Sequence, residues 1–241
     1  MANKFYSEGQ QRAAKVNDLF DLVAPRYDLM NDLQSFGLHR LWKRRLVRQA
    51  GPRPAEWALD LCCGTGDIAF ALARHGALVV GLDFNRPMLA VAEKKCRRLR
   101  DGAPRPQFIC GNALQIPFPD GSFEMVTIGY GLRNLTSCEA GLREMRRVAK
   151  PGGRLLVLDF GKPDNPLWRR IYFGYMKAFV PLLGRVFCGD AAAYAYILES
   201  LNHYPAQRGV AEKMNELGLN QVRILNLLGG VMSINYGEKT A

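Results

Sequence analysis

The stretch Leu59 to Asp67, which reads Leu-Asp-Leu-Cys-Cys-Gly-Thr-Gly-Asp, constrains the fold of this chain more than any other. An apolar run over residues 57–61 leads into Gly-Thr-Gly, and helix-forming residues follow at 68–73. This order predicts a strand, a glycine turn and a helix, because two glycines let the backbone lie close to a bound molecule and adopt torsions that other residues resist. A second apolar run ends at Asp83, about where a ribose-binding acid belongs in a nucleotide-binding βαβ unit.

The glycine turn alone fits two classes of ligand. Gly64, Gly66 and Ala69 match the loose dinucleotide pattern G-x-G-x-x-A. A pyrophosphate at the helix N-terminus would be repelled by the carboxylate of Asp67 in the first turn. Asp67, together with Asp60 on the strand, instead suits a cationic ligand such as S-adenosylmethionine, which carries an ammonium, a sulfonium and a ribose. The sequence therefore favours S-adenosylmethionine over a dinucleotide, with helix capping as the alternative role of Asp67.

The charge balance and the cysteines limit the partners and the compartment. A net charge of +11 favours anionic partners, which include nucleic acid, anionic lipid and acidic substrates. Because the basic residues are spread along the chain, a solvated surface is the alternative; we expect no nucleic acid and retain an anionic membrane as a candidate partner.

None of the six cysteines forms a C-x-x-C pair, which favours reduced thiols and no metal site. The chain lacks an apolar signal region and a membrane-spanning run, so we expect a cytoplasmic protein, with a homodimer left open.

From residue 57 onward, predicted strands alternate with predicted helices. We expect strands at 57–61, 78–83, 107–110, 123–128 and 154–160, helices at 68–73, 87–100 and 139–149, and a closing antiparallel hairpin of 222–227 and 231–236. This alternation predicts a single α/β domain over 1–241, with a mostly parallel sheet and helices on both faces. Ligands of such sheets bind beyond the carboxyl ends of the strands. Those ends carry residues 63–67, Asp83, 111–113, 129–134 and 159–162.

Helical segments flank this sheet in the sequence. Residues 1–50 form a predicted helical cap, whose amphipathic part at 38–47 either covers a cofactor pocket or packs on the sheet edge. Residues 51–162 form the predicted cofactor-binding half, and 163–241 supply substrate-side helices and the hairpin. Within the last part, the segment 166–187 contains aromatic residues beside arginines and lysines, which suits a membrane interface or a hydrophobic substrate. An ordinary packed helix is the alternative.

Motifs outside the glycine turn carry a resemblance to a known family. They are Ala24-Pro25-Arg26-Tyr27-Asp28 with Met30-Asn31-Asp32, Gly37-Leu38-His39-Arg40 with Trp42-Lys43, the segment 114–120, Gly131-Leu132-Arg133-Asn134, the segment 150–160, Glu199-Ser200 and the segment 226–231. Over nearly its whole length, the chain resembles the ubiquinone/menaquinone biosynthesis C-methyltransferases, which are class I S-adenosylmethionine-dependent methyltransferases. The resemblance implies a Rossmann-like fold with a seven-stranded sheet, and methylation of a ring carbon in a polyprenylated hydroquinone. Demethylmenaquinol is the first expectation; a ubiquinol precursor, a phylloquinone-type ring, another small molecule and RNA are the alternatives.

The resemblance also implies where the cofactor is held. The matching positions are Thr65, Asp83, Asn112 with Ala113, and Gly129, where the family often has serine. A glycine at position 129 removes one side-chain hydrogen bond to the cofactor, so the backbone at this position must bind it instead. Together with the glycine turn, the predicted cofactor-binding set is Asp60, Gly64, Thr65, Gly66, Asp67, Asp83, Asn112, Ala113 and Gly129.

Methylation of a ring carbon needs a phenol that loses its proton, because the phenolate pushes charge onto the ortho carbon. Arg133 and Asn134 follow the fourth predicted strand, beside the expected methyl group. We predict that Arg133 lowers the phenol pKa or acts through a water, since guanidinium is not a base at neutral pH. Asn134 is predicted to orient a ring oxygen, and Tyr27 is a second catalytic candidate. The alternatives are an ion pair of Arg133 with Asp28 or Asp32, and a core position for Tyr27.

Other interpretations compete with this site. His39 in Gly-Leu-His-Arg is expected to cap or pack rather than to transfer a proton. A nicotinamide-dependent oxidoreductase and a non-catalytic protein that keeps only the fold are the competing functions.

Overall fold

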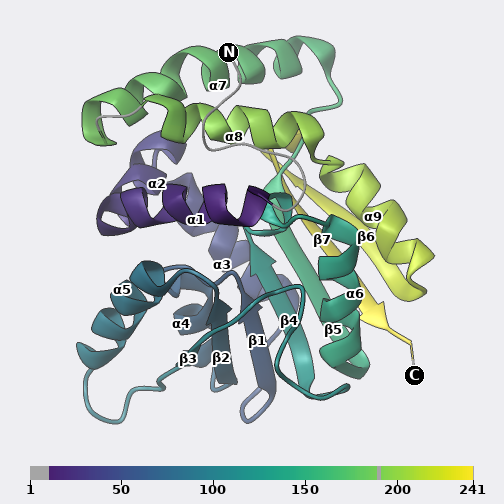
Figure 1. Cartoon of the computed structure of the whole chain (residues 1–241). Helices are drawn as coiled ribbons and strands as arrows, with labels where there is room; N and C mark the ends of the chain where they lie inside the picture. The colour runs from purple at the N-terminus through teal and green to yellow at the C-terminus, as the bar shows by residue number, and fades with distance from the viewer. Residues whose placement is uncertain (1–10, 189–190, 241) are drawn as a thin grey trace.

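Seven strands form one sheet in the order β3-β2-β1-β4-β5-β7-β6 (Figure 1). The computed structural model describes residues 11–188 and 191–240, without the side chains of residues 180–195. The strands are β1 (Trp57–Leu61), β2 (Leu78–Asp83), β3 (Gln107–Cys110), β4 (Phe123–Gly129), β5 (Ala149–Phe160), β6 (Leu219–Leu227) and β7 (Met232–Lys239). Strands β1 to β5 pair in parallel, and β7 is antiparallel to both β5 and β6. The predicted fold class, a mostly parallel sheet closed by an antiparallel hairpin, is confirmed.

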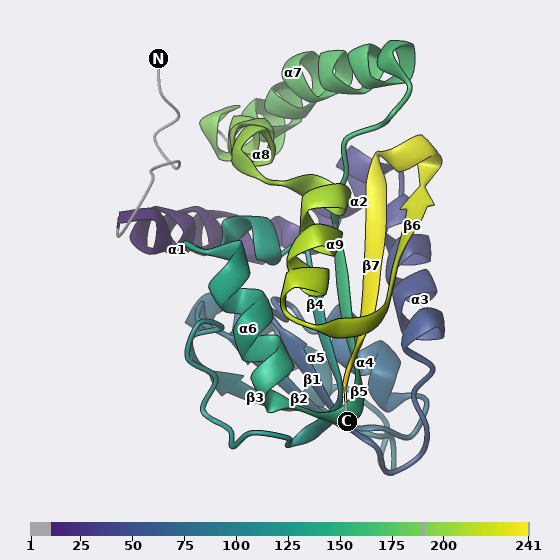
Figure 2. The same ribbon diagram turned by 90° about the vertical axis from the view of Figure 1, so that its right-hand side faces the viewer.

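The central strands are apolar along their length because helices cover both faces of the sheet. Leu59 of β1 lies between Val80 of β2 and Val126 of β4 in the parallel register, and all three side chains are buried. The helices are α1 (Gln11–Val23), α2 (Tyr27–Ser35), α3 (Leu38–Ala50), α4 (Asp67–Ala73), α5 (Arg86–Arg97), α6 (Cys138–Val148), α7 (Pro166–Cys188), α8 (Ala191–His203) and α9 (Ala206–Glu216), with 3-10 turns η1 (Ala24–Arg26), η2 (Leu132–Asn134) and η3 (Leu228–Gly230). Figure 2 shows α6 and α9 on one face of the sheet and α3 on the other.

A layer of helices lies across the carboxyl ends of the parallel strands, at the top of Figure 1. It consists of α1, α2, α7 and α8; α7 packs against α8 and α2, and α8 contacts η2 after β4. The helix predicted at 38–47 is α3, which packs against α4 and β5 on the face of the sheet. Within the described residues, no helix is both long enough and apolar enough to cross a membrane. For the segment predicted at 166–187, side chains are described up to residue 179.

Two loop predictions have different outcomes. The break expected at 150–153 lies inside β5, which begins at Ala149; the pairing with β4 shifts between Phe123 and Met125, so a bulge absorbs the glycines without ending the strand. The hairpin is confirmed as β6 and β7 joined by η3. There Gly229 and Gly230 have φ values of +64° and +93°, which are torsions that residues with a side chain rarely adopt.

Candidate active site

Two cavities adjoin at the carboxyl ends of the strands. The first cavity, of about 330 Å³, is bordered by the glycine turn after β1, the end of β2, the loop after β3 and the end of β4. Five members of the predicted cofactor-binding set line it: Gly64, Asp83, Asn112, Ala113 and Gly129. The parallel sheet therefore gathers these residues from four separate strand ends, as the topology of such sheets requires.

Asp83 connects the first cavity to the glycine turn. Its carboxylate accepts hydrogen bonds from the backbone N–H of Gly64 at 2.8 Å and of Asn85 at 2.9 Å. Burial raises the pKa of Asp83, while these backbone donors act in the opposite direction. A carboxylate has about four acceptor positions, so these backbone donors leave room for a hydroxyl group of a ligand in the cavity. Gly64 has a φ of +54°, a torsion that explains why the turn needs glycine there.

Asp67 does not line the first cavity, and its charge is already compensated. Its carboxylate lies 2.7 Å from the Nζ of Lys43 and 3.1 Å from the Nζ of Lys95. Burial raises the pKa of Asp67, but the two lysines outweigh burial and lower the pKa to about 2. The expectation that this carboxylate attracts a cationic ligand is not supported by the geometry, because two cations already neutralise it.

Asp60 and Thr65 also lie outside the first cavity, beside a small pocket of about 20 Å³. Asp60 accepts hydrogen bonds from Thr127 Oγ1 at 2.8 Å and from the N–H of Ala69 at 3.1 Å, so it joins β1 to β4 and to α4. Burial raises its pKa to about 7 despite these donors. Thr65 donates its hydroxyl to Asp28 Oδ1 at 2.7 Å. Both side chains therefore connect the glycine turn to neighbouring elements of the protein, Asp60 to β4 and α4 and Thr65 to α2.

Two glycines of the set are explained by their neighbours. Gly66 has a φ of +85°, and a Cβ there would lie 2.8 Å from Phe70 and 2.9 Å from Phe108. At Gly129, where the resemblance implies serine in many relatives, a Cβ would lie 2.4 Å from Cδ1 of Ile68. The space that a serine side chain would need is therefore filled by Ile68.

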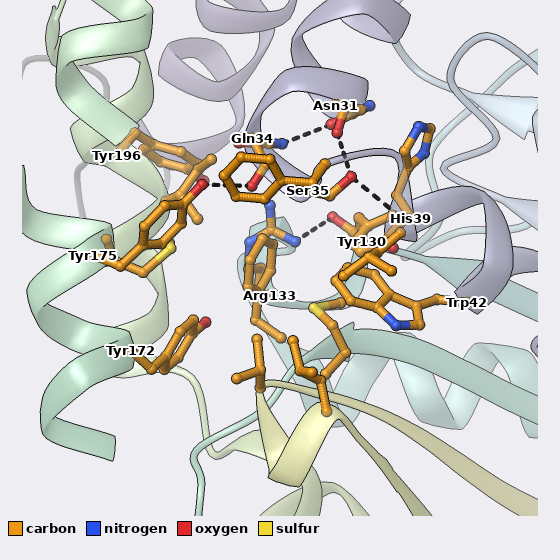
Figure 3. A pocket seen from close by; sticks show the side chains of 18 of the residues that line it. Asn31, Gln34, Ser35, His39, Trp42, Tyr130, Arg133, Tyr172, Tyr175 and Tyr196 are labelled. Atoms are coloured by element: carbon orange, nitrogen blue, oxygen red, sulfur yellow. Dashed lines mark hydrogen bonds between the residues drawn. The ribbon is translucent and has the colours of Figure 1, made fainter. Parts of the chain in front are cut away.

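The second cavity, of about 290 Å³, lies between the N-terminal helices and α7 and α8 (Figure 3). Apolar and aromatic side chains form most of its wall, among them Leu19, Val23, Trp42, Phe160, Trp168, Ile171, Met176, Ile197, Val231 and Met232. It shares Phe20, Tyr27 and Tyr130 with the first cavity. The predicted catalytic residue Tyr27 thus stands on the wall between the two cavities. Burial raises the pKa of Tyr27 to about 12, although Asn31 and Arg133 act to lower it.

Arg133 lies in the wall of the second cavity and forms a buried ion pair. Its Nη1 donates to Asp159 Oδ1 at 2.7 Å and to the carbonyl oxygen of Tyr130 at 2.8 Å. Its guanidinium also stacks over the ring of Phe160, with 4.7 Å between the guanidinium carbon and the ring centroid. Burial opposes the charge of Arg133, but Asp159 raises its pKa above the ordinary value. The site therefore holds a permanent cation.

The partner of Arg133 differs from the alternative considered for the sequence. Asp28 lies instead within 2.6 Å of Lys95, and Asp32 binds His39 and Arg40. An ion pair therefore exists, but Asp159 is the acid. Asp159 is the residue before the last one of β5, in the segment 159–162 that the sequence places at the carboxyl end of a strand.

Asn134 is separated from Arg133 by the wall between the cavities. It lines the first cavity and not the second. Its Nδ2 donates to the carbonyl oxygen of Tyr130 at 3.2 Å, and its Oδ1 accepts a hydrogen bond from the hydroxyl of Tyr196 at 3.1 Å. These two hydrogen bonds connect η2 to α8 through Asn134. Asn134 does not line the second cavity, so the geometry does not place it against a ring bound there.

The sequence did not single out two tyrosines as site residues. Tyr130 and Tyr172 both line the second cavity, and neither buried hydroxyl has a hydrogen-bond partner in the described part of the chain. The sequence could have indicated Tyr130, because it directly follows Gly129 at a strand end. It indicated Tyr172 less clearly, through the aromatic residues of the segment that forms α7. Nε of Arg133 is buried and also lacks a partner among the described residues, so a wall that is mostly apolar contains several polar atoms without hydrogen bonds.

His39 also lines the second cavity, but its ring belongs to another network. Its Nε2 lies 2.8 Å from Asp32 Oδ1, and Figure 3 shows the imidazole pointing away from Arg133. Burial lowers the pKa of His39, and the nearby Lys43 lowers it further. This geometry agrees with the packing role expected for His39.

Comparisons with known proteins show the family to which this chain belongs. The model of the ubiE/COQ5 methyltransferase family matches residues 8–239. The chain is 44% identical over 237 residues to the ubiquinone/menaquinone biosynthesis C-methyltransferase UbiE of Ectopseudomonas mendocina, covering 95% of this chain and 90% of that protein. It is 43% identical over 232 residues to the UbiE of Cupriavidus pinatubonensis, covering 95% and 94%.

Solved structures support the same fold. A SAM-dependent methyltransferase from Aquifex aeolicus matches with a TM-score of 0.61 and 17% identity, over 88% of this chain and 97% of that one. Haemonchus contortus phosphoethanolamine N-methyltransferase 2 in complex with S-adenosyl-L-methionine matches with a TM-score of 0.61 and 14% identity, over 83% of this chain and 52% of that one. At these identities the likeness concerns the fold alone. The family match over nearly the whole chain is the stronger finding, and this protein belongs to the ubiE/COQ5 methyltransferase family of S-adenosylmethionine-dependent methyltransferases.

Proposed function

We propose that this protein methylates a ring carbon of a polyprenylated hydroquinone, and that its substrate is demethylmenaquinol. The relatives are named for C-methylation in ubiquinone and menaquinone biosynthesis. The observation that carries the proposal is the pair of cavities that share Phe20, Tyr27 and Tyr130. One cavity has the carboxylate of Asp83 for a ribose, and the other has aromatic walls and the buried guanidinium of Arg133, paired with Asp159, for a ring with acidic hydroxyls.

The first cavity fits S-adenosylmethionine by the chemistry of its walls. Asp83 offers free acceptor positions to ribose hydroxyls, while Asn112, Ala113 and Gly129 border the rest of the space. When bound, this cofactor supplies a methyl group on a positively charged sulfur. We propose that the methyl group faces the shared wall, since a substrate in the second cavity must meet it there.

Arg133 is proposed to make the ring nucleophilic. Asp159 balances the charge of Arg133, but Nε of Arg133 is buried without a partner among the described residues and can donate a hydrogen bond. A phenolate forms more readily where such a charged donor binds it, because a hydrogen bond to the charged form lowers the pKa of the phenol. The phenol proton leaves to water or to a neighbouring group, since guanidinium cannot accept it. The ring carbon ortho to the phenolate then forms the new C–C bond while the S–C bond breaks, and loss of the ring proton restores the aromatic hydroquinone.

The test is methyl transfer by the purified protein from S-adenosylmethionine to a short-chain demethylmenaquinol, followed by mass spectrometry. A demethylated ubiquinol precursor and RNA are offered in parallel. We expect the naphthoquinol to be methylated at carbon. Transfer only to the benzoquinol would correct the ring, and transfer to neither quinol would refute the proposal. The Arg133→Ala variant should lower kcat by about 10²- to 10³-fold with little change in cofactor affinity, as for other groups that stabilise developing charge.

An exposed arginine supplies the control for that variant. Arg143 on α6 has a side chain that is 65% exposed and pairs with Glu139 at the surface. Arg143→Ala removes the same charge from the protein but should leave kcat unchanged. Equal losses in both variants would show that net charge, rather than the position of Arg133, causes the effect.

We further propose that the mouth of the second cavity meets an anionic membrane, where the prenyl tail of the substrate resides. Phe36, Ile171 and Leu228 line the cavity and are 73%, 52% and 51% exposed, so the rim itself is apolar. Arg170 and Lys177 are exposed on α7, the helix that also carries Ile171. Flotation with anionic vesicles at low salt should carry the protein upward, and Phe36→Glu should weaken it. Absence of binding at low salt would exclude this contact.

A further inference from the structure

Helix α7 places two tyrosines in the wall of the second cavity, and their hydroxyls differ. Tyr175 donates its hydroxyl to the carbonyl oxygen of Gln34 at 2.7 Å, which ties α7 to α2. Tyr172, one turn earlier, is 5% exposed, and its buried hydroxyl has no hydrogen-bond partner among the residues that the structure describes. Figure 3 shows this hydroxyl directed toward the middle of the cavity, on the side of Arg133.

A buried hydroxyl without a partner destabilises the folded protein, so it calls for an explanation. Tyr172 lines the second cavity but not the first, so a molecule bound in the second cavity lies within its reach. Burial raises the pKa of Tyr172, so the hydroxyl stays protonated and can donate. What it lacks is an acceptor within the second cavity.

We propose that Tyr172 donates a hydrogen bond to the hydroquinone oxygen that lies farther from the methylated carbon. This inference rests on the proposed function. The reacting carbon and the oxygen next to it must lie at the wall shared with the first cavity, which Phe20, Tyr27 and Tyr130 form. The opposite ring oxygen then points into the part of the cavity that α7 borders. Tyr172 thereby selects a ring with two para oxygens over a ring with one.

The test compares two substrates in three proteins. The substrates are 2-prenyl-1,4-naphthohydroquinone and 3-prenyl-1-naphthol, which keeps the oxygen next to the reacting carbon and lacks the other. The proteins are the wild type, Tyr172→Phe and Tyr175→Phe. The difference in intrinsic reactivity between the two rings is the same for all three proteins. Only a change in the ratio of kcat/KM for the two substrates therefore reports on the proposed contact.

We expect Tyr172→Phe to lower kcat/KM for the hydroquinone about 5- to 10-fold, mainly through KM, and to leave the naphthol nearly unchanged. Its melting temperature should equal or exceed that of the wild type, since the variant removes an unpaired buried hydroxyl. Tyr175→Phe should keep the wild-type substrate ratio and lower the melting temperature, because it breaks the bond to Gln34.

Two results would overturn the inference while the proposed function stands: an unchanged substrate ratio in Tyr172→Phe, or a loss of stability in that variant like that of Tyr175→Phe. If the wild type methylates neither ring, the proposed function fails and this inference fails with it.

Discussion

The buried pair of Arg133 and Asp159 should respond very differently to the loss of each partner. Their side chains are 7% and 1% exposed, and the ion-pair distance is 2.7 Å. Replacing Asp159 with Leu leaves a guanidinium that cannot lose its charge. Among the described residues, it keeps only the carbonyl oxygen of Tyr130 as a hydrogen-bond acceptor. We expect this variant to lose about 3–5 kcal/mol of unfolding free energy, the usual cost of an uncompensated buried charge.

Replacing Arg133 with Met should cost less. Asp159 would keep two backbone donors, the N–H of residue 133 at 3.2 Å and of Phe160 at 2.9 Å. A carboxylate can also take up a proton, whereas a guanidinium cannot release one. We expect a loss of about 1–3 kcal/mol. The double variant should be more stable than Asp159→Leu alone, because replacing a whole buried pair with apolar groups is often close to neutral.

Urea denaturation of the three variants measures these differences directly. The surface pair of Arg143 and Glu139 is the control, with a distance of 2.6 Å but side chains that are 65% and 48% exposed. Breaking that pair should cost about 0–1 kcal/mol. The reasoning is refuted if Asp159→Leu costs no more than the surface pair, or if Arg133→Met is the more damaging of the two single variants.

Three further outcomes are expected. The pKa of Asp67 is lowered from 3.8 to about 2, so its pairing with the lysines stabilises the protein above about pH 4, and this stabilisation is lost as the pH falls through 2. Asp67→Asn should abolish that part of the acid-unfolding curve, and an unchanged curve would contradict this prediction. Gly129→Ser should cost at most about 1 kcal/mol, because a Cβ there would meet Cδ1, the flexible end of the Ile68 side chain, and a change of rotamer relieves the contact. Thermal unfolding measures this cost, and a large loss of stability that Ile68→Ala rescues would show that Ile68 cannot move aside. Asp83→Asn should weaken S-adenosylmethionine binding in calorimetry, and unchanged affinity would remove Asp83 from the cofactor site.

Local features of the sequence were enough to predict the sheet and the position of the first cavity. Apolar runs such as 57–61 and 78–82 define buried strands, because only side chains of that kind can fill a sheet covered on both faces. Glycines at 64 and 66 mark the turn, since their torsions exclude most other residues. The carboxyl ends of parallel strands meet at one edge, so the sequence alone predicts that Asp83, Asn112 and Gly129 lie together.

Only the tertiary structure decided which charges are paired. Asp67 follows the glycine turn and was interpreted as a carboxylate facing a ligand, but Lys43 and Lys95 from two other helices neutralise it. Arg133 could have paired with several acids, and the fold selects Asp159 by bringing the end of β5 beside η2. Charge pairing depends on distances of a few ångströms between residues far apart in the chain, and the order of residues along a sequence carries no such distances. The same holds for Tyr172 and Tyr175, which are alike in sequence and differ only in whether an acceptor lies within reach of the hydroxyl.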